Sequence, residues 1–188
     1  RQFIHQEYGV RQLLVEHTHF TDPEKREHIR RLLIRAAQQK TIPIVNYNDP
    51  VSDEENRKME LAIRRSHGDQ VVECVDNDET AAVIANLVHA KKLVLMTSTE
   101  GIYRDPADPK TLVEQVTAKS MEELEEKVRQ LQESCVGASR AGANGAKAKL
   151  EYALKSARQG TMVIIGHARH RLSDLVEGRV ACTRIGLE

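Results

Sequence analysis

Polar side chains gather after a short apolar run at residues 41–45, and their types suit recognition of a small charged molecule. Amides can donate to a carboxylate and accept from an amine, and Asp49 could pair with an ammonium group. Asn, Asp and Pro are also favoured in turns, so a polar turn without a ligand is the alternative. The residues of this cluster are Asn46, Tyr47, Asn48 and Asp49.

A second polar group, Asp76, Asn77 and Asp78, directly precedes a stretch with helical periodicity. Asp76 or Asn77 could cap that helix. A helix N-terminus also favours an anionic ligand through its free N–H groups and its dipole. Three polar residues exceed what one cap requires, so we keep both readings: a redundant cap, or a contact to a ligand.

Two further loops could bind phosphate. After an apolar run at 92–97, Thr97 and Ser98 open a polar loop with a turn at Gly101, a composition common to many α/β proteins. The second loop, 142–149, contains glycine and enters a helix with lysines on its first turns. Backbone N–H groups and a mobile lysine suit phosphate there, whereas solvated lysines on a surface helix are the alternative. The spacing differs from that of a Walker A loop.

The elements that must position these residues alternate along the chain. Short apolar runs predict strands, and amphipathic or capped stretches predict helices. Ligands of such sheets bind beyond the carboxyl ends of the strands. We therefore predict an α/β fold, a three-layer αβα sandwich with a mostly parallel sheet. The predicted strands are 10–16, 41–45, 92–97, 161–165 and a possible edge strand at 180–185; the predicted helices are 23–39, 53–66, 79–90, 120–134 and 146–159.

Composition narrows the function classes. The chain has 188 residues, and 28 basic residues balance 28 acidic ones, so no whole-chain field attracts nucleic acid or an anionic membrane. No apolar run is long enough to span a bilayer, and no secretion leader is visible at Arg1. Three widely spaced cysteines and the absence of Trp argue against zinc, disulfides and a base-stacking surface. We expect a cytoplasmic protein that binds small molecules and has no protein-held metal among its site residues.

The order of these segments resembles the glutamate 5-kinases of the amino acid kinase family. The resemblance covers roughly residues 8–186 and is carried by the segments IPIVNYNDPV, VDNDETAAVIANLVHAKKLVLMTSTEGIYRDPADP and GANGAKAKLEYALKSARQGTMVIIGHARHRLSDLVEGRVACTRIG. It implies the carbamate kinase-like fold of that family. It also implies ATP and Mg²⁺ as cofactors, phosphorylation of the γ-carboxylate of glutamate in proline biosynthesis, and a homo-oligomer, either a dimer or a tetramer.

The resemblance also implies roles for individual residues. The implied catalytic residues are Lys149 and Asp78. Lys149 matches the lysine that faces the ATP phosphates, and Asp78 matches the carboxylate that organises the catalytic lysines. The implied substrate-binding residues follow the strand 41–45 or precede the helix 79–90. The implied nucleotide-binding residues lie in the loop after residue 97 and in the loop 142–149. The substrate-binding residues are Asn46, Asp49 and Asn77, and the nucleotide-binding residues are Thr97, Ser98, Tyr103, Gly142, Gly145 and Lys149.

The chain departs from the family pattern in places. The family begins with a strand bearing a glycine-rich turn and a lysine, which is not found here, so we expect residues 1–188 to be the C-terminal three-quarters of the kinase domain, N-terminally incomplete and without a PUA domain. Ser98 stands where the family usually has Asp, Asn144 replaces a glycine, and the charged stretch 51–72 is longer than the family's substrate loop. Two alternatives stay open: a kinase for a nucleoside monophosphate, carbamate or isopentenyl phosphate, and a non-catalytic ligand-binding relative.

Overall fold

The structure is a computed structural model that describes residues 4–16, 18–47, 63, 66, 77–105, 107–134 and 145–188. The chain divides into two compact units, Arg1–Thr80 and Ala81–Glu188. Each unit has its own sheet, and we describe the two separately. The prediction that residues 1–188 form one kinase domain stays a prediction.

The first unit is built on a parallel pair of strands, β1 (Gly9–Val15) and β2 (Thr41–Tyr47), joined by the helices α1 (Thr18–Thr21) and α2 (Pro23–Gln38). This confirms the predicted strands and the predicted helix start. The carboxylate of Asp22 accepts the backbone N–H groups of Glu24 and Lys25 at 2.9 and 3.0 Å. The bond from the Lys25 N–H is the largest cause of the lowered pKa of Asp22.

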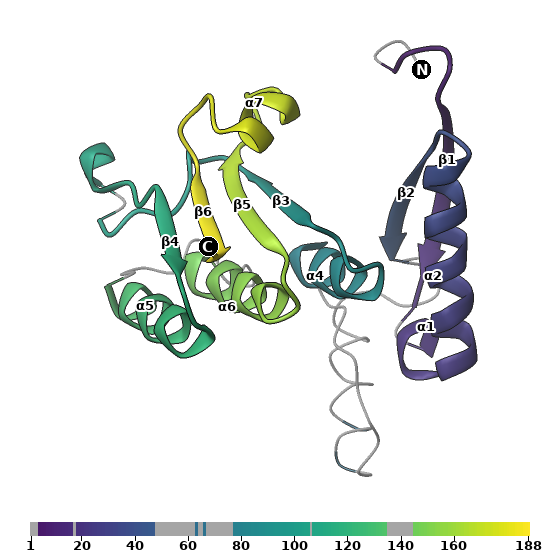
Figure 1. Ribbon diagram of the computed structural model, residues 1–188, viewed down its shortest axis with the longest axis horizontal. Coiled ribbons are helices and arrows are strands. Elements are labelled where there is room, and N and C mark those ends of the chain that lie inside the picture. Colours follow the sequence, from purple (N-terminus) through teal and green to yellow (C-terminus); the bar gives the residue numbers. More distant parts are fainter. Residues whose placement is uncertain are drawn as a thin grey trace. The chain divides into compact units, whose positions relative to one another are not determined.

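The second unit contains a four-stranded sheet in the order β3-β5-β6-β4 (Figure 1). β3 and β5 are parallel, β6 and β4 are parallel, and β5 and β6 are antiparallel. Parallel pairing therefore dominates, as the alternation of apolar runs and helices predicted. The elements are α4 (Asn77–Leu87, from Ala81 on in this unit), β3 (Lys92–Thr97), η1 (Pro109–Thr111), β4 (Gln115–Ala118), α5 (Met121–Ser134), α6 (Gly145–Ala157), β5 (Met162–His167), α7 (Leu172–Glu177) and β6 (Thr183–Leu187).

The sheet of the second unit is covered on both faces. Alternate residues of β5 point to opposite sides, so Val163 and Ile165 join one core while Ile164 joins another. The larger core contains residues of α5 and α6, and the smaller contains Leu175 of α7 and Cys182. The two cores make this unit a helix–sheet–helix sandwich of three layers. The fully buried residues of the larger core are Leu124, Val128, Leu150, Ala153, Val163, Ile165 and Ile185.

Residues close in sequence determine where α5 begins and where α6 ends. Ser120 Oγ accepts the Glu123 N–H at 3.3 Å, and the Glu123 carboxylate accepts the N–H of Lys119, so the predicted capping pair opens α5. Gly160, with a φ of +80°, follows the end of α6 and reverses the chain into β5. Both helices end within about two residues of their predicted bounds.

Two predictions about strands and helices need correction. The 180–185 segment was expected as an edge strand, whereas β6 lies inside the sheet between β5 and β4. Its position is set by β4, a four-residue strand that local periodicity did not predict. The short helix α7 was also missed, because six residues give too little periodicity to detect. The predicted helix at 53–66 lies largely outside the described residues.

Candidate functional site

The carboxyl ends of β3 and β5 lie side by side. The two strands are in parallel register, with Thr97 opposite His167. The N–H of Ala168 donates to the Thr97 carbonyl at 2.8 Å, which extends the pairing one residue past the strands. In a parallel α/β arrangement this edge is where ligands bind, because the loops beyond it can approach a bound molecule without breaking the sheet. We call it the β3/β5 carboxyl edge.

The loop after β3 is fixed to β6 by one hydroxyl. Thr183 Oγ1 accepts the Ile102 N–H at 2.8 Å and donates to the Val113 carbonyl at 2.6 Å. Gly101 must remain glycine for this contact, because a Cβ there would lie 2.4 Å from Thr183 Oγ1. Thr97 and Ser98 therefore lie at the end of β3, and Tyr103 lies farther along the loop, where it bridges Leu112.

From the connectivity of the chain, we expect the N-terminus of α6 near the same edge. α6 leads into β5 and packs on β5 and β6, so it runs opposite to β5 and begins toward that strand's carboxyl end. Its first residue, Gly145, has a φ of +47°, a conformation that suits glycine. Lys149 follows one turn later and is partly buried. Gln132 of α5 donates to the Lys147 carbonyl at 3.1 Å and ties the end of α5 to this turn.

This arrangement can bind a phosphorylated ligand. A helix N-terminus presents unpaired N–H groups and the positive end of a dipole, and Lys149 adds a charge on a flexible stem. The polar loop after β3 offers hydroxyls and backbone groups along a second side. The second unit contains five of the residues predicted for nucleotide binding, and their role stays a prediction: Thr97, Ser98, Tyr103, Gly145 and Lys149.

The predicted acceptor-binding residues lie elsewhere in the chain. Asn46 is exposed near the end of β2 in the first unit. Asn77 and Asp78 form the first turn of α4, where the acidic side chain of Asp78 complements the helix dipole. Asp49 and Gly142 lie outside the described residues. Their roles in substrate and nucleotide binding stay predictions.

Sequence reasoning missed three interacting polar residues at the β3/β5 carboxyl edge. The carboxylate of Glu100 pairs with Arg169 and with His170, and Glu100 Oε2 lies 2.6 Å from His170 Nε2. These partners are about seventy residues apart in sequence, and each sits in an ordinary polar loop. No local pattern could pair them; only the parallel register of the strands does so.

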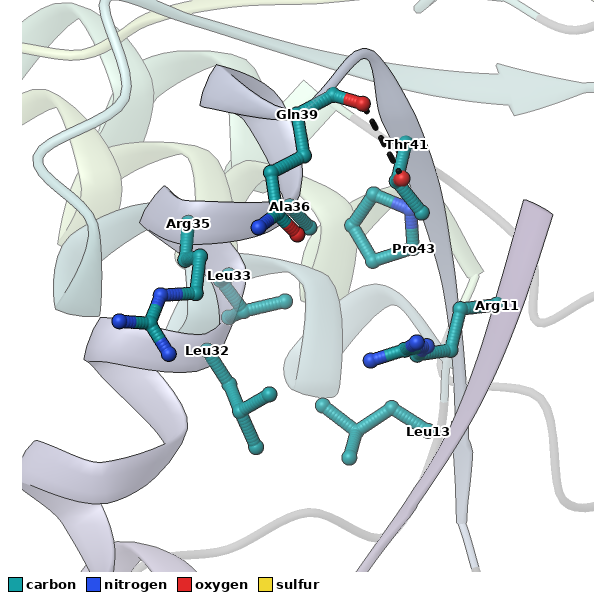
Figure 2. A pocket seen from close by; sticks show the side chains of 9 residues that line it. All are labelled: Arg11, Leu13, Leu32, Leu33, Arg35, Ala36, Gln39, Thr41 and Pro43. Carbon is teal, nitrogen blue, oxygen red and sulfur yellow. Dashed lines mark hydrogen bonds between the residues drawn. The ribbon is translucent and has the colours of Figure 1, made fainter. Parts of the chain in front are cut away.

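Two hollows are lined by described residues of the first unit. The smaller one, about 40 Å³, lies between α2 and the strands β1 and β2 (Figure 2). Its volume suits a water molecule rather than a substrate. The larger one, about 730 Å³, is open and has acidic and basic side chains from α2 on its wall. None of the predicted site residues lines either hollow. The smaller is lined by Arg11, Leu13, Leu32, Leu33, Arg35, Ala36, Gln39, Thr41 and Pro43.

Two classes of feature are absent from the part of the chain that the structure describes. It contains no group of three or more His, Cys, Asp or Glu side chains placed to hold a metal ion. Among the same residues, no helix has both the length and the apolar character needed to cross a bilayer.

The chain is similar in sequence to curated glutamate 5-kinases. The chain is 30% identical to a glutamate 5-kinase of Geobacillus thermodenitrificans over 189 aligned residues, covering 99% of this chain and 45% of that protein. It is 28% identical to a glutamate 5-kinase of Chromobacterium violaceum, covering 95% of this chain and 44% of the relative. The chain therefore spans somewhat less than half the length of these curated relatives.

Solved structures with related folds align less closely. A carbamate kinase from Giardia lamblia bound to AMP-PNP aligns with a TM-score of 0.46 at 19% identity, over 60% of this chain and 32% of that one. A UMP kinase from Ureaplasma parvum aligns with a TM-score of 0.42 at 9% identity, over 97% of this chain and 100% of that one.

A family model also matches most of the chain. The model described as "Amino acid kinase family" matches residues 3–167, which include both strands of the first unit and the β3/β5 carboxyl edge of the second. A match over that much of the chain establishes membership. This protein belongs to the amino acid kinase family.

Proposed function

We propose that this protein transfers the γ-phosphate of ATP to the γ-carboxylate of L-glutamate, giving glutamyl 5-phosphate. One observation carries the proposal: a polar loop follows the carboxyl end of β3, and α6, with Lys149 in its first turns, leads into the neighbouring parallel strand β5, in a chain of the amino acid kinase family. The similarity to glutamate 5-kinases along almost the whole chain supports glutamate as the acceptor. The reaction would be the first step of proline biosynthesis, and we propose that it occurs in the cytoplasm.

The proposed step requires little covalent chemistry from the protein. A carboxylate is ionised at neutral pH, so one of its oxygens attacks the γ-phosphorus without a general base. The bond between the γ-phosphorus and the β,γ-bridging oxygen breaks, and ADP leaves with the electron pair. Catalysis then consists of holding the two reactants in line and neutralising charge on the moving phosphoryl group.

The groups at the β3/β5 carboxyl edge suit that task. The N-terminal N–H groups of α6 and the ammonium group of Lys149 would stabilise the negative charge of the phosphates. Thr97, Ser98 and Tyr103 would hold the nucleotide from the loop after β3. Mg²⁺ enters in this proposal as its complex with ATP, since it binds substrate phosphates with few protein ligands and keeps several waters.

The acceptor would be recognised by amides and carboxylates. We propose that Asn46, Asp49 and Asn77 bind the amino-acid end of glutamate, with Asp49 facing the ammonium group and the amides facing the carboxylate. Asp78 would orient the catalytic lysine. A carboxylate at the acceptor site favours an amino acid over an acceptor whose only charged group is a phosphate, because like charges repel.

The test is a hydroxamate assay on the purified protein carrying its whole natural chain, with Mg-ATP, L-glutamate and hydroxylamine. Glutamate-dependent hydroxamate and equimolar ADP support the proposal. Parallel reactions replace glutamate with aspartate, UMP, carbamate or isopentenyl phosphate, and ADP release is followed. Turnover with one of these and not with glutamate would identify a kinase for another acceptor. Nucleotide binding without any turnover would identify a non-catalytic relative.

A further inference from the structure

Glu100 joins the two loops that leave the β3/β5 carboxyl edge. It lies three residues beyond Thr97, and its partners Arg169 and His170 follow the end of β5. One carboxylate oxygen pairs with the Arg169 guanidinium, and the other lies 2.6 Å from His170 Nε2. The side chains of Glu100 and His170 are only 16% and 20% exposed. We refer to these three residues as the Glu100 clamp.

The turn after β5 is shaped to present both partners. His167 Nδ1 accepts the N–H of Arg169 at 3.0 Å, and the His170 N–H donates to the His167 carbonyl at 3.0 Å. The rings of His167 and His170 meet edge to face, with centroids 6.3 Å apart. These contacts hold the backbone of the turn without any contribution from Glu100. The Glu100 side chain therefore pairs with two residues whose backbone is already held in place.

The other side of the clamp is fixed as well. Gly101, the next residue, is packed against Thr183, and Ile102 donates to the same hydroxyl. The backbone between Thr97 and Gly101 is thus held at its first end by the strand and at its second end by β6. Thr99 adds a local bond from its hydroxyl to the Gly101 carbonyl at 3.0 Å. Glu100 is the residue in this span whose side chain reaches across to the neighbouring loop.

The clamp differs from the other ion pairs of the second unit. Most of those join exposed side chains on one helix, such as Lys155 with Glu151, where solvent screens the attraction. Glu100 and His170 are both largely removed from water, whereas Arg169 is 64% exposed. Glu100 engages both partners, and the charge-assisted bond to His170 is the one that low exposure to water strengthens. It also joins segments distant in sequence, so its loss releases a loop rather than a single side chain.

We propose that Glu100 is a positioning residue for nucleotide binding. By pairing with Arg169 and His170, it holds the backbone of residues 98–101 in the conformation that receives ATP, without itself touching the nucleotide. The inference rests on the proposed function, since it names the site that the clamp serves. Glu100 is the acidic side chain of this loop nearest in sequence to Thr97.

The first experiment measures the loop in the absence of nucleotide. Amide hydrogen exchange of residues 99–103 is compared between the wild-type protein and Glu100→Ala. We expect exchange to become faster by about tenfold, as the loss of one strong charge-assisted bond implies. Exchange in β5 and α6 should not change, which shows that the variant is folded. Unchanged exchange in the loop would overturn the clamp, whatever the protein's activity.

The second experiment measures substrate use by the complete protein. We expect Glu100→Ala to raise the KM for ATP by about tenfold with the KM for the acceptor within about twofold of the wild type. Glu100→Gln should lie between the two, because its amide can still bond to one partner. The double variant Glu100→Ala, His170→Ala should show less than the sum of the two separate effects, because both changes remove the contact between Glu100 and His170.

A matched control separates the clamp from loss of charge alone. Glu125 also pairs with a distant arginine, Arg158, at 2.9 Å, but on the exposed surface of α5 and α6. Glu125→Ala should leave both KM values unchanged. Faster loop exchange with an unchanged KM for ATP would overturn the positioning role. A wild-type protein that neither binds nor consumes ATP would overturn the proposed function, and the positioning role with it, while the exchange result still decides whether the clamp exists.

Discussion

The hydroxyl of Thr183 accepts the backbone N–H of Ile102 across 81 residues of sequence, at 2.8 Å, and donates to the Val113 carbonyl. Thr183 is fully buried. One side chain on β6 therefore satisfies both limbs of the loop that leaves β3. The shape of that loop depends on a strand whose position in the sheet cannot be inferred from the loop's own sequence.

Replacing Thr183 with Val tests this contact. Val keeps the shape of the side chain but removes the hydroxyl, so the Ile102 N–H and the Val113 carbonyl lose a buried partner. We expect unfolding of the second unit to become easier by about 2 kcal/mol, the usual cost of leaving a buried polar group unsatisfied. Urea denaturation followed by circular dichroism measures it. Thr117→Val, which loses only an exposed bond to Glu188, is the control and should have little effect.

The glycine after α7 provides a second test. Gly178 has a φ of +74°, and a Cβ there would lie 2.8 Å from Arg184 Nη2, which donates to the Leu175 carbonyl at the end of α7. Gly160 has a similar φ of +80° and open space around it. Both Ala variants carry the backbone cost of a left-handed residue, about 1 kcal/mol. We expect Gly178→Ala to lower the free energy of unfolding, measured in urea, by about 1 kcal/mol more than Gly160→Ala does. The reason is that Arg184 must move away from the carbonyl oxygens that accept its hydrogen bonds.

A second background checks the cause of that difference. In Arg184→Met protein the guanidinium is gone, so Gly178→Ala and Gly160→Ala should destabilise equally. A difference that persists in this background would mean that Arg184 is not the group displaced. The six proteins are the wild type, the Arg184→Met protein and the two Ala variants in each of these backgrounds, each measured by urea denaturation.

Lys149 tests the phosphate site directly. We expect Lys149→Ala to lower kcat by at least about 100-fold with the fold intact, because the amine would stabilise charge that develops in the transition state. Lys155→Ala is the control: it lies near the other end of α6, pairs with Glu151 on the surface, and should retain wild-type turnover. Steady-state rates and thermal unfolding curves are measured for both. Equal kcat values in the two variants would remove Lys149 from the mechanism.

Glu27 on α2 offers a test by pH. Hydrogen bonds from Arg30 and then Arg31 lower the pKa of Glu27 from 4.5 to about 2. The folded-state pKa is therefore below the unfolded one, so the stabilisation is present above pH about 4.5 and is lost as the pH falls toward 2. Carbon-13 NMR titration of the Glu27 carboxyl measures the pKa. In Arg30→Gln protein the midpoint should move back toward 4.5; a midpoint near 4.5 in the wild type would contradict the pairing.

The local sequence pattern was enough to predict those features whose physical cause lies within a few residues. The apolar run Lys92–Thr97 predicted β3 with both ends correct, and Asp22 followed by Pro23 predicted where α2 begins. Cap hydrogen bonds and short apolar strands depend on residues that are close in sequence. The identities of neighbouring residues are therefore enough to predict them. The family resemblance predicted the amino acid kinase family, and the family match over residues 3–167 confirms it. The roles of the nucleotide-binding residues stay predictions.

Tertiary structure decided what depends on distant partners. The interior place of β6 follows from pairing with β4, whose four residues carry no periodic signal of their own. The pairing of Glu100 with His170 follows from the parallel register of β3 and β5, which sets the two loops beside each other. A sequence lists charges and hydroxyls but not their neighbours, since long-range contacts arise only when hydrophobic burial has fixed the sheet order. The chemistry of each residue was therefore readable from the chain, whereas its partner was not.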